Sequence, residues 1–190
     1  MAGTGEMNQR VTVLELTEAA GELRWREHHR AWAQVVEDSR VNLFSSVGIG
    51  ARGVTLTLWR NPALTLLCAL RWRDKFLFLT AITDGDDQLH SVVTAAVVNP
   101  VPCTRHTVDG TADLRFPGIL TEKYRGRADI HEQLEPLALL TLRFVLVTPK
   151  AVTLRPGTLV EAGGKLYAVL AAHELDWFKN EYEIERREDC

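Results

Sequence analysis

The second half of the chain repeats the pattern of the first half, and this repeat restricts the fold more than any other feature. Residues 54–98 and 139–187 each contain an alternating apolar strand, a proline, a second apolar stretch and, after a polar turn, a last strand. Within them, two lysine-led apolar segments begin at Lys75 and Lys165, 90 positions apart in a chain of 190. An internal period of this kind indicates repeated structural units.

The local pattern within each repeat is typical of β structure. Val54, Leu56 and Leu58 alternate with threonines, which predicts a strand with one face turned inward. Gly163-Gly164 has the form of a two-residue hairpin turn that needs positive φ. We therefore predict a mainly β fold of two tandem small β-barrel or sandwich modules, with long loops and little helix.

The boundary between the modules is predicted at a proline-rich segment. Two prolines in three residues, Pro100 and Pro102, stiffen the chain and lack donors for a sheet. The first module then covers residues 1–98 with a flexible arm at 1–9, the linker residues 99–103, and the second module residues 104–190.

Three further features of the first module carry local expectations. Trp32 and the paired valines after it favour a strand, with Trp32 in the core. Asn42–Gly53 is rich in Gly and Ser and is interpreted as a loop between two strands. Residues 64–71 and 75–82 form a hairpin around Arg73-Asp74.

The sequence contains no pattern typical of catalysis or of metal binding. His28 and His29 are adjacent, so on a regular strand they would point to opposite faces and could not hold one ion together. Gly48, Gly50 and Gly53 form a loose G-x-G-x-x-G, but it precedes a strand and does not open a helix after one. We expect no enzyme, no cofactor and no metal.

The net charge bears on the kind of partner, and the cysteine content bears on the cellular compartment. The net charge is −3 and neither half has an excess of basic residues, which argues against a nucleic-acid footprint. The three cysteines form no CxxC and no signal-like segment precedes them, so we expect a soluble intracellular product. The longest apolar run is too short to cross a membrane.

Two pairs of aromatic and basic residues could make contacts. Trp59 lies beside Arg60, and Trp72 lies between Arg71 and Arg73. Such pairs can stack on nucleic-acid bases, and they are also common at protein–protein contacts. Because the chain is not basic overall, we favour protein contacts.

The order of these segments resembles the tailed-bacteriophage head–tail joining proteins, also called head-closure or stopper proteins, in an apparently duplicated form. The resemblance rests on the arginine-led strand at residues 10–14, the segment Ala31-Trp32-Ala33-Gln34-Val35 and the hairpin at residues 75–82. The second half repeats the last part at residues 163–169. The family is usually a single domain of about half this length, and here Phe78 stands where its hairpin has a tyrosine.

The resemblance implies a structural protein of the virion neck, assembled in the host cytoplasm. It implies a homo-oligomeric ring with a portal or adaptor protein on the head side and a tail terminator or tail tube protein on the tail side. DNA would pass through the lumen without sequence-specific binding. The residues that we expect to make contacts are Asn42, Phe44, Ser45, Ser46, Gly48, Gly50, Arg52, Gly53, Trp59, Arg60, Arg71, Trp72, Arg73, Arg125 and Arg127.

Two other functions remain open from the sequence. One is a different structural role in the same particle, as a tail terminator, a tail-completion protein or a capsid-associated protein. The other is a cytoplasmic β-barrel that binds nucleic acid or a small ligand.

Overall fold

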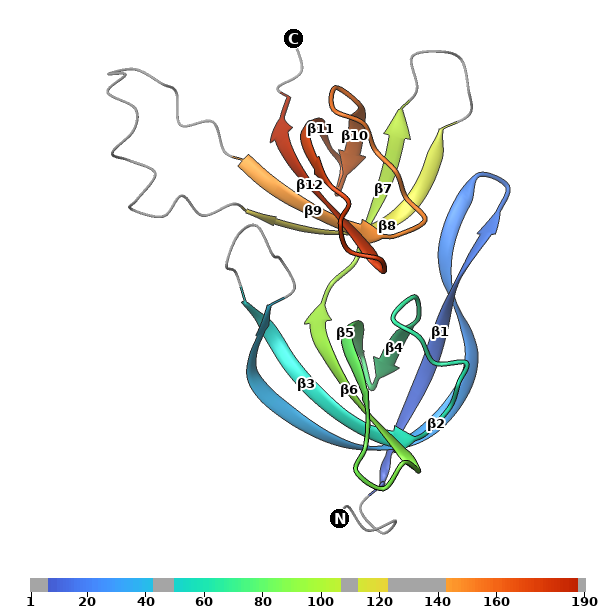
Figure 1. Cartoon of the computed structure of the whole chain (residues 1–190). Coiled ribbons are helices and arrows are strands. Elements are labelled where there is room, and N and C mark those ends of the chain that lie inside the picture. The colour runs from blue at the N-terminus through green and yellow to red at the C-terminus, as the bar shows by residue number, and fades with distance from the viewer. Residues whose placement is uncertain (1–6, 43–49, 107–112, 123–142, 188–190) are drawn as a thin grey trace, which may run out of the picture. The chain divides into compact units, whose positions relative to one another are not determined.

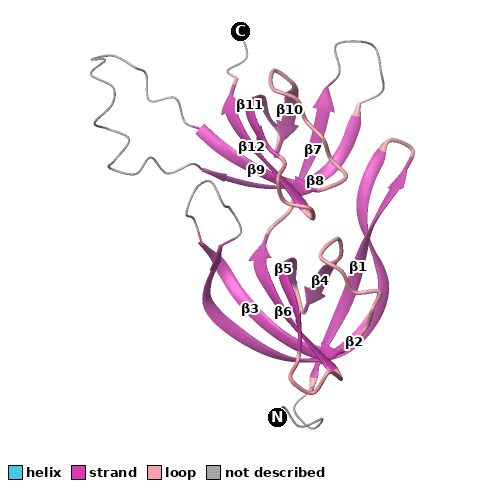
Figure 2. Cartoon of the chain, in the orientation of Figure 1, coloured by secondary structure: helices cyan, strands magenta, loops and turns pink. Residues whose placement is uncertain are grey.

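The computed structural model of the chain describes residues 7–42, 50–106, 113–122 and 143–187 (Figure 1). All regular structure in these segments is β-strand, as Figure 2 shows by colour. The predicted mainly β fold is thereby confirmed. The chain divides into two compact units, Met1–Pro100 and Val101–Cys190.

The first unit is a sheet of six antiparallel strands that closes on itself. Its strands are β1 (Gln9–Ala19), β2 (Glu22–Asn42), β3 (Gly50–Trp59), β4 (Ala69–Trp72), β5 (Lys75–Asp84) and β6 (His90–Val98). The pairings run β1–β4–β5–β6–β3–β2 and return to β1. A sheet closed in this way is a barrel around its own core.

The second unit has the same topology. Its strands are β7 (Val101–His106), β8 (Leu114–Glu122), β9 (Arg143–Pro149), β10 (Leu159–Ala162), β11 (Lys165–His173) and β12 (Lys179–Arg186). They pair in the order β7–β10–β11–β12–β9–β8 and return to β7. This order is that of the first unit with six added to each label, so the repeat in the sequence is also a repeat of topology.

The two modules also share register. In the first hairpin Trp72 pairs with Lys75, and in the second Ala162 pairs with Lys165. Both pairs flank two-residue turns, and in the second turn Gly163 and Gly164 have φ of 58° and 77°. The positive-φ turn predicted for this glycine pair is confirmed, because an ordinary residue is strained in that region.

The core of the first module follows the predicted alternation of β3. Val54, Leu56 and Leu58 are buried, and the threonines between them are only partly covered. On the neighbouring strand the inward residue opposite Leu58 is Ala33, and it is completely buried. Trp32 therefore points outward and is 56% exposed, so its predicted place in the core is wrong.

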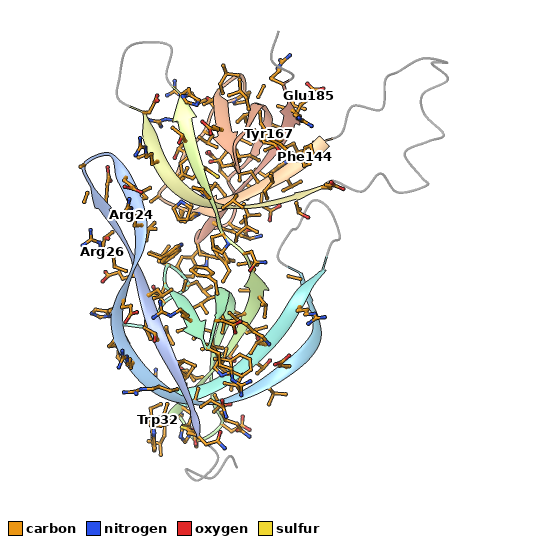
Figure 3. All side chains as sticks on the ribbon, turned by 180° about the vertical axis from the view of Figure 1, so that it is seen from behind. Arg24, Arg26, Trp32, Phe144, Tyr167 and Glu185 are labelled. Atoms are coloured by element: carbon orange, nitrogen blue, oxygen red, sulfur yellow. The ribbon has the colours of Figure 1, made fainter. Side chains whose placement is uncertain are left out.

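The core of the second module is closed by an aromatic contact and a close backbone approach. Phe144 and Tyr167 meet edge to face, with ring centroids 5.3 Å apart (Figure 3). A Cβ atom at Gly118 would lie 2.7 Å from Cys103 Sγ and 2.7 Å from Leu146 Cδ1. Only glycine fits between these two side chains without a shift of the core.

Two predicted boundaries are corrected. Val101–Cys103 belongs to β7 and not to the linker, because these residues pair with β8. Pro102 is tolerated there because the pairing of β7 with β10 begins only at Cys103. Its missing N–H therefore costs no ladder bond. In the first module the strand after Asn61-Pro62 begins at Ala69 and not at Leu64, because residues 61–68 form two turns closed by Leu64 N–H to Asn61 O and Cys68 N–H to Thr65 O, both 3.0 Å.

Candidate interaction surface

An aromatic row lies on the outer face of the first module. Ala33 pairs with Leu58 and Trp59 pairs with His90, so the register carries Trp32, Trp59 and His90 across β2, β3 and β6. Trp59 is 50% exposed, and its ring lies 4.5 Å from that of His90 between centroids. Figure 3 shows Trp32 at one end of the first module, where β1 begins. Two half-exposed tryptophans on one face are typical of a contact surface.

A pocket of about 290 Å³ opens beside this row. Val13, Leu58 and Leu64 supply buried apolar atoms, and the exposed residues include Arg30 and Arg60. The complete lining is Val13, His29, Arg30, Ala31, Trp32, Leu58, Trp59, Arg60, Asn61 and Leu64. The pocket therefore combines an apolar interior with a basic and aromatic rim.

Hydrogen bonds hold the rim in place. Asn61 Nδ2 lies 3.2 Å from His29 Nε2, and Asn61 Oδ1 accepts from Ala63 N at 3.0 Å. Arg60 pairs with Asp84 at 3.3 Å, and its backbone N–H donates to Leu89 O at 2.8 Å. The segment after β3 is therefore fixed both to β2 and to the turn before β6.

The carboxylate of Asp87 holds His90, whose ring contacts Trp59. Asp87 accepts hydrogen bonds from His90 Nδ1 and from the backbone N–H groups of Leu89 and His90, the last two at 3.0 and 3.1 Å. The hydrogen bond from His90 contributes most to holding the pKa of Asp87 below its ordinary value. Within the described part of the chain His90 Nε2 is buried and has no hydrogen-bond partner.

The second module has an acidic and a basic residue at the equivalent positions of its last turn. Lys179 pairs with Asp176 at 3.3 Å and also with the buried Glu181. Asp176 and Lys179 each lie 89 positions after Asp87 and His90, respectively. The turn before Lys179 carries Leu175, which is fully exposed, and Trp177, which is 60% exposed. Two large apolar side chains are therefore exposed in one turn, each next to a carboxylate residue.

Of the predicted contact residues, Trp59 and Arg60 lie in the pocket lining, and the Arg71–Arg73 group does not. Arg71 is paired with Glu27, and Arg73 lies over the Trp72 ring at 4.6 Å. Trp72 itself is 4% exposed and belongs to the core. Its predicted role in contacts is therefore wrong, because its strand turns it inward.

The predicted loop Asn42–Gly53 is corrected at both ends. Asn42 lies in β2, and Gly50, Arg52 and Gly53 lie in β3. Arg52 and Gly53 pair with β6, which extends the strand through the glycine-rich sequence. Phe44, Ser45, Ser46, Gly48, Arg125 and Arg127 lie outside the described residues.

His28 and His29 lie on the same side of β2, contrary to the expectation from alternation. Val13 pairs with His29 and Leu14 with Glu27, so His28 is the extra residue of a β-bulge. The bulge brings the two Nδ1 atoms to 3.0 Å. Nothing in the sequence signals this bulge.

Residues that the sequence interpretation missed are Arg30, Leu175 and Trp177. The available signal is the run Glu174-Leu175-Asp176-Trp177, in which large apolar residues alternate with carboxylates in a polar turn. Nowhere in the segments that the structure describes do three or more His, Cys, Asp or Glu side chains gather as a metal site would require. Those segments also include no helix with the length and apolar character needed to traverse a bilayer.

No protein-family model matches the chain, and no curated protein matches it. One solved structure shows weak similarity, that of the Bacillus subtilis inhibitor of motility MotI (DgrA). The identity is 10%, the alignment covers 97% of this chain and 90% of that chain, and the TM-score is 0.19. A score of this size carries no argument about fold or function.

Proposed function

We propose that the chain is a structural component of the neck of a tailed phage or phage-like particle. In this role identical copies form a ring around the DNA channel between head and tail. The proposal starts from the resemblance to head–tail joining proteins, whose arginine-led strand and Ala-Trp-Ala-x-Val segment fall on β1 and β2. β1 pairs with the first part of β2, from Glu22 to Ala33, and this pairing helps to close the first module.

The observation that carries the proposal is the aromatic and basic pocket on a closed β module. Trp32, Trp59, Arg30 and Arg60 are surface residues of the types that are enriched at protein–protein contacts. A closed sheet supports such contacts as a rigid base and hides its strand edges from unwanted pairing. We assign no catalytic residue, because a ring component works through shape and contact.

The overall charge supports a channel that DNA can pass. The chain has a net charge of −3. Affinity for phosphate rises with the number of cationic contacts, so a surface without excess positive charge lets a duplex slide.

The experiment is to image purified full-length protein by negative stain and to weigh it by native mass spectrometry. We expect a ring of identical copies with an open centre, and binding of the protein to DNA-filled heads that lack tails. A protein that remains a monomer at every concentration and does not bind such heads would contradict the proposal. Binding to tails, with none on tailless heads, would instead indicate a tail terminator or tail-completion role.

A nucleic-acid-binding barrel is a second candidate, because Trp59 is half exposed beside Arg60. A titration of duplex and single-stranded DNA at several salt concentrations separates the two functions. Direct use of these side chains on DNA predicts an affinity that falls steeply with salt and is lost in Trp59→Ala.

A further inference from the structure

We propose that the pocket of the first module receives the Glu174–Trp177 turn from the second module of another copy of this chain. The inference rests on the proposed function, because it names the contact that would build the ring. It concerns two surfaces that lie in different modules, so each copy carries both halves of the contact.

The first argument is the difference between two otherwise matching modules. Arg10 pairs with Trp32 in the first module, and the equivalent pair in the second is Pro102 with Pro117. Trp59 pairs with His90, and the equivalent pair is Pro149 with Lys179. Both tryptophan positions of the pocket are therefore prolines in the second module.

The turn between the last two strands differs in the opposite sense. Between β5 and β6 it reads Gly85-Asp86-Asp87-Gln88-Leu89, with one large apolar residue. Between β11 and β12 it reads Glu174-Leu175-Asp176-Trp177-Phe178, with three. The pocket is built on one module and the apolar turn on the other, which is the arrangement that a head-to-tail contact needs.

The second argument is chemical complementarity. The pocket is lined by apolar atoms of Leu58 and Leu64 and by the exposed residues Arg30 and Arg60, of which Arg60 also pairs with Asp84. The turn presents Leu175 and Trp177 with a carboxylate before each of them. Leu175 and Trp177 can enter the pocket while the carboxylates of Glu174 and Asp176, which contact Tyr182 and Lys179 in their own module, face the arginines at its rim. Opposite charges of this kind also set the orientation of docking.

The third argument concerns which copy supplies the turn. The pocket lies at the His90 end of β6, where Trp59 pairs, and the chain leaves the module at the Val98 end. A nine-residue strand spans roughly 30 Å. The pocket is therefore remote from the point at which the chain's own second module is attached, which favours a turn from a neighbouring copy.

The test uses one full-length variant on each side of the contact. Trp32→Lys places a positive charge on the pocket rim, and Leu175→Lys places one on the turn; both residues are largely exposed, so each module should fold. We expect each variant alone to be monomeric where the wild type forms rings. Val36→Lys, on the same outer face of β2, and Leu170→Lys, on β11, are matched controls that should keep the ring.

Mixing the two variants gives a sharper result. The intact turn of the Trp32→Lys copy fits the intact pocket of the Leu175→Lys copy, and the other two surfaces are both blocked. We therefore expect a one-to-one heterodimer and nothing larger in native mass spectrometry. Rings formed by either variant alone, or a mixture without heterodimer, would overturn the inference and leave the proposed function in place.

A cross-link covers the case in which copies associate only on heads. The double variant Trp32→Cys/Leu175→Cys, bound to tailless DNA-filled heads and oxidised, should give a ladder of disulfide-linked copies on a denaturing gel. Each single variant should give none. A cross-linked monomer, or no cross-link in protein that does bind heads, overturns the inference, whereas failure of the wild type both to form rings and to bind heads overturns the proposed function itself.

Discussion

Thr80 and Leu170 lie 90 positions apart, and each is the extra residue of a β-bulge in the fifth strand of its module. In β5 the register against β6 shifts between Leu79 and Ala81, and in β11 the register against β12 shifts between Val169 and Ala171. A bulge bends its strand and increases the local twist. The same bend at the same place indicates that both modules close by the same geometry, and each has its own core.

Separate cores predict that damage to one module leaves the other folded. Leu56 and Leu146 are completely buried in the first and second modules. Leu56→Ala and Leu146→Ala should each cost about 2–5 kcal/mol of the stability of their own module. Hydrogen exchange measured by mass spectrometry should show lost protection in that module alone, with exposed Val36→Ala as the control. Equal loss in both modules would show that they fold as one unit.

The contact of Gly118 predicts a strongly position-dependent effect of one methyl group. Gly118→Ala places a Cβ 2.7 Å from both Cys103 Sγ and Leu146 Cδ1. Overpacking of this kind should destabilise the second module by about 1–3 kcal/mol in denaturant unfolding. Adding Leu146→Ala should make the effect of the glycine substitution smaller. Additive effects of the two changes would show that the methyl group does not meet Leu146.

The buried Lys179–Glu181 pair should be far more sensitive than an exposed pair. Lys179→Met leaves the carboxylate of Glu181 buried without this cation and should cost about 3–5 kcal/mol. Glu37→Gln breaks the solvent-screened pair with Lys75 and should change the unfolding free energy little. Adding Glu181→Gln to Lys179→Met should recover part of the loss in the same unfolding measurement. Similar costs for the buried and the exposed pair would contradict this account.

Two buried acids should weaken the second module at alkaline pH. Burial raises the pKa of the Cys103 thiol to about 12 and that of the Tyr182 hydroxyl to about 12. The folded state therefore holds both protons more tightly than the unfolded state, whose thiol and phenol titrate near about pH 9 and about pH 10. Their contribution to stability is complete below those values and is lost as the pH rises toward about 12.

The measurement for these acids is the slope of unfolding free energy against pH above about pH 9. The double variant Cys103→Ala/Tyr182→Phe should have the shallower slope, although it loses the hydrogen bonds of Tyr182 with Val152 O and Leu154 N. An unchanged slope would mean that these groups do not titrate with unfolding.

The strands were predictable where apolar alternation and turn chemistry agree. In Val54–Leu58 only one set of side chains can face the core, because valine and leucine alternate with threonine. Gly163-Gly164 defines its hairpin because the turn needs positive φ twice. Because the sequence repeats, a strand or turn predicted in one module also predicts its equivalent in the other.

Which side chains of β2 face the core was not predictable, because its sequence allows either alternating set to point inward. In the segment from Ala31 to Val35 either the alanines or Trp32 could face the core, and the large aromatic suggests the second choice. Inside a closed six-stranded sheet there is little space, and the small Ala33 occupies the inward position against Leu58. Barrel closure is a tertiary property, which a local pattern does not contain.

The candidate surface was only partly predictable for the same reason. Trp59 and Arg60 are visible as an aromatic–basic pair, but so is Arg71-Trp72-Arg73, and only the fold separates an exposed tryptophan from a buried one. The pocket also needs residues from β1, β2 and the segment after β3, which come together through long-range pairing. The bulge at His28 likewise breaks the period that any strand interpretation assumes.

Each of the described strands has two neighbours within its own module. A slip of one residue along any pairing would have to be matched around the whole cycle, so the register is locked collectively and cannot drift strand by strand. Either module can therefore accept new side chains on its outside while its backbone stays in place. The chain therefore has two closed sheets whose outer side chains can change independently of each other. The connection between their strands is only two residues long, Asn99 and Pro100.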